Sequence, residues 1–209
     1  MGVATRVTVA FGGTFDPIHS GHLQAARTAA QRLGVPRVLM IPAKVPRLRE
    51  PPHASASQRF EMLRIACESD PVLAPCDVDL LRQGAETRTI DTIEQLSGRA
   101  GSHVVWIAGN DAIRNIARWH RPSDLSKQAS LVVLNRFVTD QSRTPEGFGE
   151  TDDPHALLET PGLAYWPPDS MPAISSTAVR EALRRRDFGE LRVPREVIKY
   201  IDMNGLYRD

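Results

Sequence analysis

The chain has 209 residues, with 26 lysines and arginines against 25 aspartates and glutamates. This near balance gives no overall field for gripping nucleic acid or anionic lipid, so neither partner is expected and any anion site has to be local. The two cysteines, Cys67 and Cys76, are too far apart for a CxxC pair. No secretory leader and no apolar run long enough to cross a bilayer is expected, which favours a cytoplasmic protein.

Apolar runs alternate with stretches of helical spacing along most of the chain. Buried strands are expected at 6–11, 37–43, 103–109 and 129–135, with further strands at 72–81 and 163–168. Apolar residues at 23, 26, 30 and 33 share one helical face, and Gly34 supplies a stop signal. Further helices are expected at 57–69 and 89–97, and two more near the C-terminus, over 175–188 and 193–207.

This order of elements predicts an α/β, Rossmann-like fold: a doubly wound, mainly parallel sheet with helices on both faces and a small C-terminal helical extension. We expect a single domain over 1–209, with a core of about 1–170 and a helical part of about 171–209. Ligands of such sheets bind beyond the carboxyl ends of the strands. Segment 137–154 lacks periodicity and is expected to be an exposed insertion.

The stretch VAFGGTFDPIHSGHL, residues 9–23, lies where the first strand gives way to the first helix. Gly12 and Gly13 let backbone amides approach an anion closely, because neither has a Cβ, and Thr14 adds a hydroxyl donor. The helix that follows offers free amides and a positive dipole end. The pattern predicts a phosphate site that has neither the P-loop sequence nor GxGxxG.

Two histidines, His19 and His22, fall on the same side of the first turn if this helix begins near Ser20. Their imidazoles can then donate hydrogen bonds to phosphate oxygens. Together with Asp16 they also form a DxxHxxH pattern, whose side chains suit zinc or another transition metal. A metal site would leave the glycines before it without a role, and a plain surface turn is the third interpretation.

A second cluster of donors occurs in AISSTAVREAL, residues 173–183. Ser175, Ser176 and Thr177 place hydroxyls and amides at the start of a helix, and Arg180 lies one turn later, where its forked cation can reach back. A nucleoside triphosphate needs a second anion clamp of this kind. A capped helix with a solvated arginine is the alternative.

Together, GGTFDPIHSGHL and ISSTAVR resemble the GGTFDPxHxGH and ISSTxxR signatures of the nicotinate-nucleotide adenylyltransferases, in the HxGH nucleotidyltransferase superfamily. The resemblance covers nearly the whole chain. It implies transfer of the adenylyl group of ATP to nicotinate mononucleotide, giving nicotinate adenine dinucleotide and pyrophosphate. It also implies catalytic roles for His19 and His22, and binding of ATP and its phosphates by Gly12, Gly13, Thr14, Phe15, Ser175, Ser176, Thr177 and Arg180. Mg²⁺ would arrive with ATP, and no metal ligand from the protein is expected.

The middle of the chain carries the segments that this resemblance assigns to the mononucleotide. IPAKVPRLRE resembles a loop IPxxxPPHK, TRTIDTI resembles a YTxxTL region, IAGNDAI a GxD motif, and ARWH a segment whose tryptophan faces the pyridine ring. From the residues themselves, a carboxylate just after a strand can hold ribose hydroxyls, and a tryptophan offers a flat apolar wall. The mononucleotide-binding residues expected are Asp16, Lys44, Arg49, Thr89, Gly109, Asp111 and Trp119.

Two positions depart from the family pattern. Leu48 replaces the common histidine of PPHK, and Arg88 replaces the common tyrosine before the ring-binding threonine. An arginine facing the ring would favour nicotinate, which carries a carboxylate, over nicotinamide. The alternatives are an adenylyltransferase for nicotinamide mononucleotide or phosphopantetheine, and, in another class, a metal-binding hydrolase or a non-catalytic nucleotide sensor. A homo-oligomer is compatible with the sequence.

Overall fold

The computed structural model describes residues 7–48, 50–84, 86–100, 103–135, 144–168, 171–187 and 192–208. Within these residues one seven-stranded sheet has the order β3-β2-β1-β4-β5-β7-β6, and all of its strand pairs are parallel. Its strands are β1 (Thr8–Gly13), β2 (Val38–Pro42), β3 (Leu73–Pro75), β4 (Val104–Gly109), β5 (Ala129–Leu134), β6 (Gly149–Glu150) and β7 (Leu163–Tyr165). The predicted doubly wound α/β fold is confirmed.

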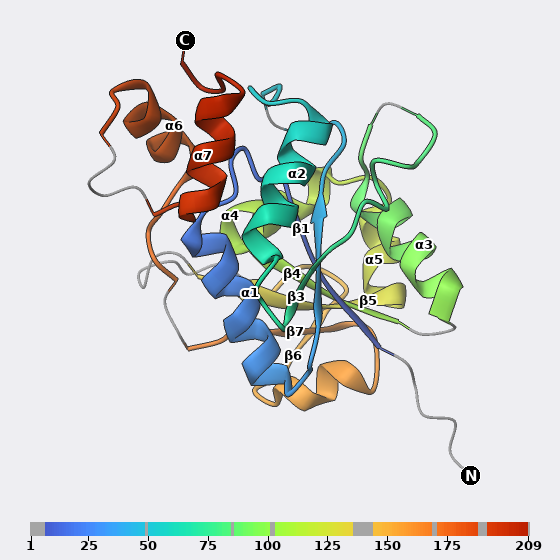
Figure 1. The fold of residues 1–209 in the computed structure, drawn as a ribbon. Coiled ribbons are helices and arrows are strands. Elements are labelled where there is room, and N and C mark those ends of the chain that lie inside the picture. Colours follow the sequence, from blue (N-terminus) through green and yellow to red (C-terminus); the bar gives the residue numbers. More distant parts are fainter. Residues whose placement is uncertain are drawn as a thin grey trace.

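Helices cover both faces of the sheet (Figure 1). They are α1 (Ser20–Leu33), α2 (Ala56–Cys67), α3 (Thr89–Ala100), α4 (Asn110–Ile113), α5 (Pro122–Gln128), α6 (Ser176–Arg184) and α7 (Arg195–Met203), with 3₁₀ turns at Ile116–Arg118 and Pro154–Leu158. The helices α1, α2, α6 and α7 lie on one side, and α3 and α5 lie on the other (Figure 1). None of the described helices is both long and apolar enough to span a membrane.

Alternating residues of the central strands build two separate cores, because successive side chains of a strand point to opposite faces. In β1, Val9 and Phe11 pack towards α1 and α2, whereas Ala10 packs towards α3. The same alternation in β4 sends Ile107 to the first core and Trp106 to the second. The sheet is therefore buried on both faces, which explains why its strands read as nearly continuous apolar runs.

The first helix ends where the sequence predicts, whereas α2, α6 and α7 end before the expected 69, 188 and 207, and α3 runs past the expected 97. Gly34 adopts the left-handed conformation after α1, with φ of 64°, and its amide donates to carbonyl oxygens of the last turn. The helix α2 starts with a capping box, in which the Ser55 hydroxyl accepts from the Gln58 amide and the Gln58 side chain accepts from the Ser55 amide. These signals fix the ends of the two helices that border the site described below.

Three expectations need correction. The first strand was expected at 6–11 but runs to Gly13, because the two glycines pair in register with Ile41 and Pro42 of β2. The strand expected at 72–81 is only three residues long, since the chain turns away after Pro75. In the segment expected to be an insertion, residues 137–143 lie outside the described part, and Gly149–Glu150 form the edge strand β6 through hydrogen bonds with the β7 region.

Candidate active site

A cavity of about 620 Å³ opens at the carboxyl ends of β1 and β4. These adjacent strands mark the point where the chain reverses its direction across the sheet, from β1-β2-β3 on one side to β4-β5 on the other. A doubly wound sheet binds its ligands at such a switch point. The walls come from the first motif, the loop after β2, the start of α3, the segment after β4 and the start of α6.

The glycines of the first motif are required by close packing inside the protein. A Cβ on Gly12 would lie 2.1 Å from Cζ2 of Trp106, and one on Gly13 would lie 2.8 Å from Cε1 of Phe15. Both aromatic rings are buried, so neither can move aside freely. Both glycines line the cavity, as expected for an anion site. The sequence analysis did not predict that they are also needed to make room for the rings of Trp106 and Phe15.

Replacing Gly12 with alanine is expected to lower the free energy of unfolding by about 1–3 kcal/mol, because the new methyl group overpacks the site beside Trp106. Urea denaturation measures the loss, and the near-ultraviolet circular dichroism of the tryptophan reports the displaced ring. The matched control is Gly98→Ala in α3, where a Cβ meets nothing within 4 Å. That variant should be as stable as the wild type or more so, since alanine favours a helix. Equal stability of the two variants would contradict the packing argument.

The two histidines of the first motif stand together at the start of α1, as predicted. His19 is the N-cap residue, and the rings of His19 and His22 stack with centroids 3.6 Å apart and an interplanar angle of 22°. Phe15, held at φ of 50°, packs edge-on against His22 with centroids 5.0 Å apart. One amide of the helix start is already used, because Ser20 donates to the carbonyl oxygen of Arg192 at 2.7 Å.

This stacking argues against the DxxHxxH metal alternative. Lone pairs of an imidazole lie in the plane of the ring, so two nearly parallel rings cannot converge on one ion between them. The third member, Asp16, has its carboxylate engaged by other donors. Within the described ranges no group of three or more His, Cys, Asp or Glu side chains is arranged to hold a metal ion.

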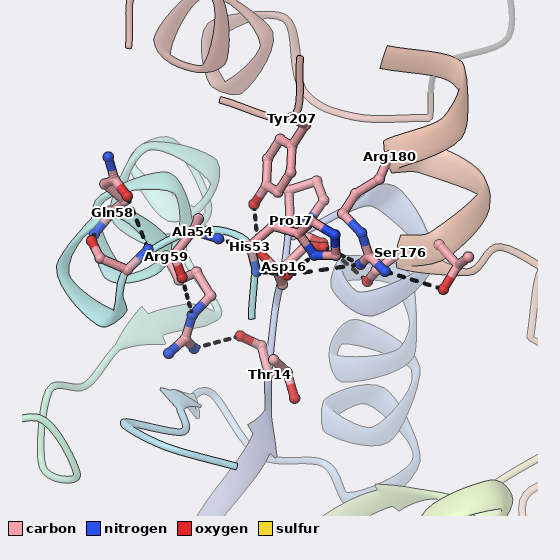
Figure 2. Close-up of polar contacts among 12 residues, drawn as sticks. Thr14, Asp16, Pro17, His53, Ala54, Gln58, Arg59, Ser176, Arg180 and Tyr207 are labelled. Carbon is pink, nitrogen blue, oxygen red and sulfur yellow. Dashed lines mark hydrogen bonds and ion pairs between the residues drawn. The ribbon is translucent and has the colours of Figure 1, made fainter. Parts of the chain in front are cut away.

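Asp16 is the centre of a buried network that joins distant parts of the chain (Figure 2). Its Oδ1 accepts from the Ala54 amide at 3.1 Å and from the Tyr207 hydroxyl at 2.7 Å, and its Oδ2 accepts from the His53 amide at 2.8 Å. Its backbone carbonyl accepts from Nη1 of Arg180 at 2.7 Å. Burial, followed by the negative charge of Asp16, raises the pKa of Tyr207, so the phenol stays protonated and donates. Asp16 also lines the cavity, so this network adds a supporting role for Asp16, and the mononucleotide contact expected from the sequence stays a prediction.

Arg59 of α2 ties the loop after β1 to both ends of the loop between β2 and α2, from inside the protein (Figure 2). Only 1% of its surface is exposed, and its guanidinium donates to the carbonyl oxygens of Thr14, Lys44 and Ala54 at 2.7, 3.0 and 3.2 Å. Burial lowers the pKa of Arg59, while the negative charge of Asp16 opposes that shift. All three nitrogens bind carbonyl oxygens, so Arg59 supports the cavity wall.

The second motif forms the opposite wall, and its four predicted residues all line the cavity. Ser175 caps α6 by accepting from the Ala178 amide at 3.1 Å. Ser176 donates to the carbonyl oxygen of Pro17 at 3.3 Å, and Nη2 of Arg180 donates to the Thr177 hydroxyl at 3.3 Å. Arg180 reaches back from α6 as expected and fastens this helix to the first motif.

Most residues expected at the mononucleotide end also line the cavity: Thr89, Gly109, Asp111 and Trp119. Arg88 lines it too and comes within 3.5 Å of Nε2 of His120. Lys44 is not in the wall, because its ammonium group donates to the carbonyl oxygen of Arg82 at 2.9 Å. The expected contact from Lys44 is therefore unsupported, and Arg49 lies outside the described residues.

Asp79 is a buried carboxylate in the wall of this end of the cavity. It accepts from the Thr92 hydroxyl at 2.6 Å and pairs with Arg82 at 3.1 Å. Burial raises the pKa of Asp79 above its ordinary value of 3.8, although both partners act to lower it. From about pH 4 upwards the folded state therefore keeps a proton that the unfolded state has lost, and the free energy of unfolding falls as the pH rises through the raised pKa.

Replacing Asp79 with asparagine removes this titration. Relative to the wild type, the variant should gain stability as the pH rises from about 4 to 7, measured by urea denaturation at several pH values. Asp70→Asn is a control for which the opposite change in stability with pH is expected. Burial acts to raise the pKa of Asp70, but hydrogen bonds from the Val72 amide, Arg27 and the Leu73 amide outweigh it and hold the pKa below its usual value. That variant should lose stability relative to the wild type as the pH rises towards about 4. A pH-independent difference for Asp79→Asn would contradict the argument.

Three residues of this architecture escaped the sequence analysis. Arg59 was noted only as part of the α2 segment, and Tyr207 only as part of the terminal helix. His53 lines the cavity directly after two prolines, so PPH does occur in the loop, five residues beyond Leu48. This PPH, shifted along the loop, was the available sequence signal for His53. No local signal identifies Tyr207, because its hydrogen-bond partner Asp16 lies 191 positions away.

Comparison with known proteins agrees with this geometry. The model of the cytidylyltransferase-like family matches residues 10–182. A probable nicotinate-nucleotide adenylyltransferase from Yersinia enterocolitica is 35% identical over 95% of this chain and 94% of its own length, and one from Dictyoglomus thermophilum is 35% identical over 94% and 96%. The fold matches that of Plasmodium falciparum nicotinic acid mononucleotide adenylyltransferase complexed with NaAD, with a TM-score of 0.74, 17% identity and 97% coverage of both chains. The chain therefore belongs to the cytidylyltransferase-like family and, within it, to the nicotinate-nucleotide adenylyltransferases.

Proposed function

We propose that this enzyme transfers the adenylyl group of ATP to nicotinate mononucleotide, giving nicotinate adenine dinucleotide and pyrophosphate in NAD biosynthesis. One observation carries the proposal: the starts of α1 and α6, which hold the phosphate-binding chemistry, line the same cavity as Thr89 and Trp119. A cavity of about 620 Å³ with polar groups at both ends suits two nucleotides brought together. The sequence similarity to proteins named for this reaction supports it.

The end of the cavity beside Trp119, where the pyridine ring is expected, favours nicotinate over nicotinamide. Arg88, Arg118 and His120 all line the cavity, and Arg118 and His120 flank Trp119 in the chain. Cationic and donor groups suit the carboxylate of nicotinate better than the neutral amide of nicotinamide. Trp119 is partly buried against the second core, which gives it a fixed face for an aromatic ring.

The reaction needs alignment and charge stabilisation more than proton transfer. An oxygen of the mononucleotide phosphate, already an anion at neutral pH, forms a bond to the α-phosphorus of ATP. The bond from the α-phosphorus to the oxygen bridging it to the β-phosphorus breaks, and pyrophosphate leaves with that oxygen. His22 and His19 stabilise charge on the transferring phosphoryl oxygens, and the edge of Phe15 holds the ring of His22 in place. Ser176, Thr177 and Arg180 hold the β- and γ-phosphates.

Magnesium enters this reaction as part of the substrate MgATP. Two carboxylates of the cavity wall suit a protein-held ion poorly, because Asp16 accepts from three donors and Asp79 is paired with Arg82. Phosphate oxygens of ATP therefore provide the ligands, and the ion neutralises their charge.

The single domain over 1–209, the cytoplasmic location and the absence of nucleic acid and membrane partners stay predictions. The near balance of charge supports the absence of nucleic-acid and membrane partners. A homo-oligomer stays open as well, and the size of the particle in solution decides it.

The test is Mg²⁺-dependent release of pyrophosphate from ATP, with nicotinate mononucleotide, nicotinamide mononucleotide and phosphopantetheine offered separately at equal concentration. The proposal predicts a strong preference for nicotinate mononucleotide. Preference for either other acceptor would move the enzyme to that branch of the superfamily. ATP binding without pyrophosphate release with any acceptor would favour a nucleotide sensor, and stoichiometric zinc in the purified protein would favour a metal-dependent hydrolase.

A further inference from the structure

His53 brings an imidazole to the cavity from the loop that precedes α2. Its side chain is exposed, yet it belongs to the cavity wall together with Pro51 and Pro52. The two prolines restrict the backbone directly before it. The loop therefore delivers this side chain from a stiff segment, although the sequence analysis assigned it no role.

Asp16 orients the ring of His53. The backbone amide of His53 donates to Oδ2 of Asp16 at 2.8 Å, and Nδ1 of its ring lies 3.4 Å from the same oxygen. Tyr207 holds the other carboxylate oxygen, Oδ1, at 2.7 Å, and its ring centroid lies 6.3 Å from that of His53. With Nδ1 facing the carboxylate, Nε2 points away from Asp16 and is left to meet a ligand. A histidine ring has two nitrogens, so one can face Asp16 while the other meets a ligand.

The other cations on this wall, like His53, have partners within the protein. The three guanidinium nitrogens of Arg59 donate to backbone carbonyl oxygens. Arg47 also lines the cavity, but it lies 3.8 Å from Glu86, which Arg88 contacts as well at 3.4 Å. Among the described residues of this wall, His53 combines a place in the cavity lining with a ring held by Asp16.

The segments that carry His53 and Arg180 approach the first motif from opposite sides. Figure 2 shows Ala54 and Arg59 of the α2 side on one side of Asp16, and Ser176 and Arg180 of α6 on the other. In-line phosphoryl transfer places the entering and the leaving oxygen on opposite sides of the phosphorus. If α6 holds the β- and γ-phosphates, the entering phosphate belongs on the side of His53.

We propose that His53 binds the phosphate of the mononucleotide, and that Asp16 and Tyr207 act as positioning residues for its ring. This assignment rests on the proposed function, because it needs a mononucleotide acceptor whose phosphate enters opposite the pyrophosphate. It gives the enzyme a specificity contact that distinguishes a mononucleotide from the corresponding nucleoside.

The first test is His53→Ala, measured by steady-state kinetics and by direct binding. KM for nicotinate mononucleotide should rise about tenfold or more, as expected for loss of a charged hydrogen bond, while KM for ATP stays unchanged. Binding of nicotinate riboside, which lacks the phosphate, should be equal in the variant and the wild type. His53→Gln keeps a neutral donor, so its KM for nicotinate mononucleotide should lie between those of the wild type and His53→Ala. His155→Ala is the matched control, because His155 is exposed and lies outside the cavity wall.

The second test is Tyr207→Phe, which removes only the hydroxyl bonded to Asp16. It should raise KM for the mononucleotide in the same direction as His53→Ala but by a smaller factor, and the double variant should be no worse than His53→Ala alone. Tyr200→Phe, in α7, is the control for removing a phenol near the C-terminus, and it should match the wild type.

Two results would overturn the assignment while leaving the proposed function intact. One is a His53→Ala enzyme with wild-type KM for nicotinate mononucleotide. The other is a variant whose binding of the riboside is weakened, relative to the wild type, as much as its binding of the mononucleotide, which would mean that His53 only supports the wall. If the wild type does not turn over nicotinate mononucleotide at all, the proposed function is wrong, and the assignment of His53, which rests on it, is wrong as well.

Discussion

Replacing His22 with alanine is expected to lower kcat by about two to three orders of magnitude, the usual effect of removing one donor to the developing charge of a transition state. The ring of His22 is fixed on two sides, by the stacked ring of His19 at 3.6 Å and by the edge of Phe15 at 5.0 Å. Such a ring is in place before the substrates arrive, so its contribution appears in the chemical step. KM for ATP should change much less than kcat.

The control for this variant is His155→Ala, whose kcat should equal that of the wild type because His155 is exposed and lies outside the cavity wall. Single-turnover measurement separates the chemical step from product release. A loss of tenfold or less in the chemical step would remove His22 from the role proposed for it.

Replacing Arg59 with alanine is expected to lower the free energy of unfolding by about 3–5 kcal/mol, a loss large enough to threaten a typical domain. The variant leaves the carbonyl oxygens of Thr14, Lys44 and Ala54 without this donor, and the contact to Ala54 is buried while the other two are partly buried. It also removes the positive charge that faces buried Asp16. The protein that remains folded should lose activity, since Thr14 is no longer tied to α2.

A matched control lies one and a half turns further along the same helix. Arg64 of α2 is about half exposed and pairs with Glu61 on the helix surface, at 2.7 Å. Such pairs contribute little, so Arg64→Ala should change the free energy of unfolding by less than about 1 kcal/mol. Urea denaturation of both variants gives the comparison. Equal losses would contradict a special role for Arg59.

The fold was predictable because its strands are buried on both faces. Runs such as 103–109 and 129–135 contain little besides apolar residues, and the structure places β4 and β5 within them. Helix ends were predictable where a residue has one dominant conformational effect, as at Gly34. The limits of β1 were not, because pairing with β2 extends it through two glycines that have low strand propensity.

The candidate site was predictable where its residues are close in sequence. His19 and His22 share a helical turn, so the spacing alone places them side by side. The supporting network was not predictable in the same way. Asp16 meets Ala54, Arg180 and Tyr207, and only the folded sheet brings these residues together. The packing of Trp106 against Gly12 also depends on the register between β1 and β4, which local sequence does not specify.

The most direct test of adenylyl transfer to nicotinate mononucleotide uses an oxygen isotope label. Nicotinate mononucleotide carrying heavy oxygen in its phosphate is incubated with MgATP and the enzyme, and both products are analysed by mass spectrometry. Attack of that phosphate on the α-phosphorus of ATP predicts nicotinate adenine dinucleotide that keeps all of the label, together with unlabelled pyrophosphate. Label in the pyrophosphate, or AMP as the product of ATP, would contradict adenylyl transfer to the mononucleotide.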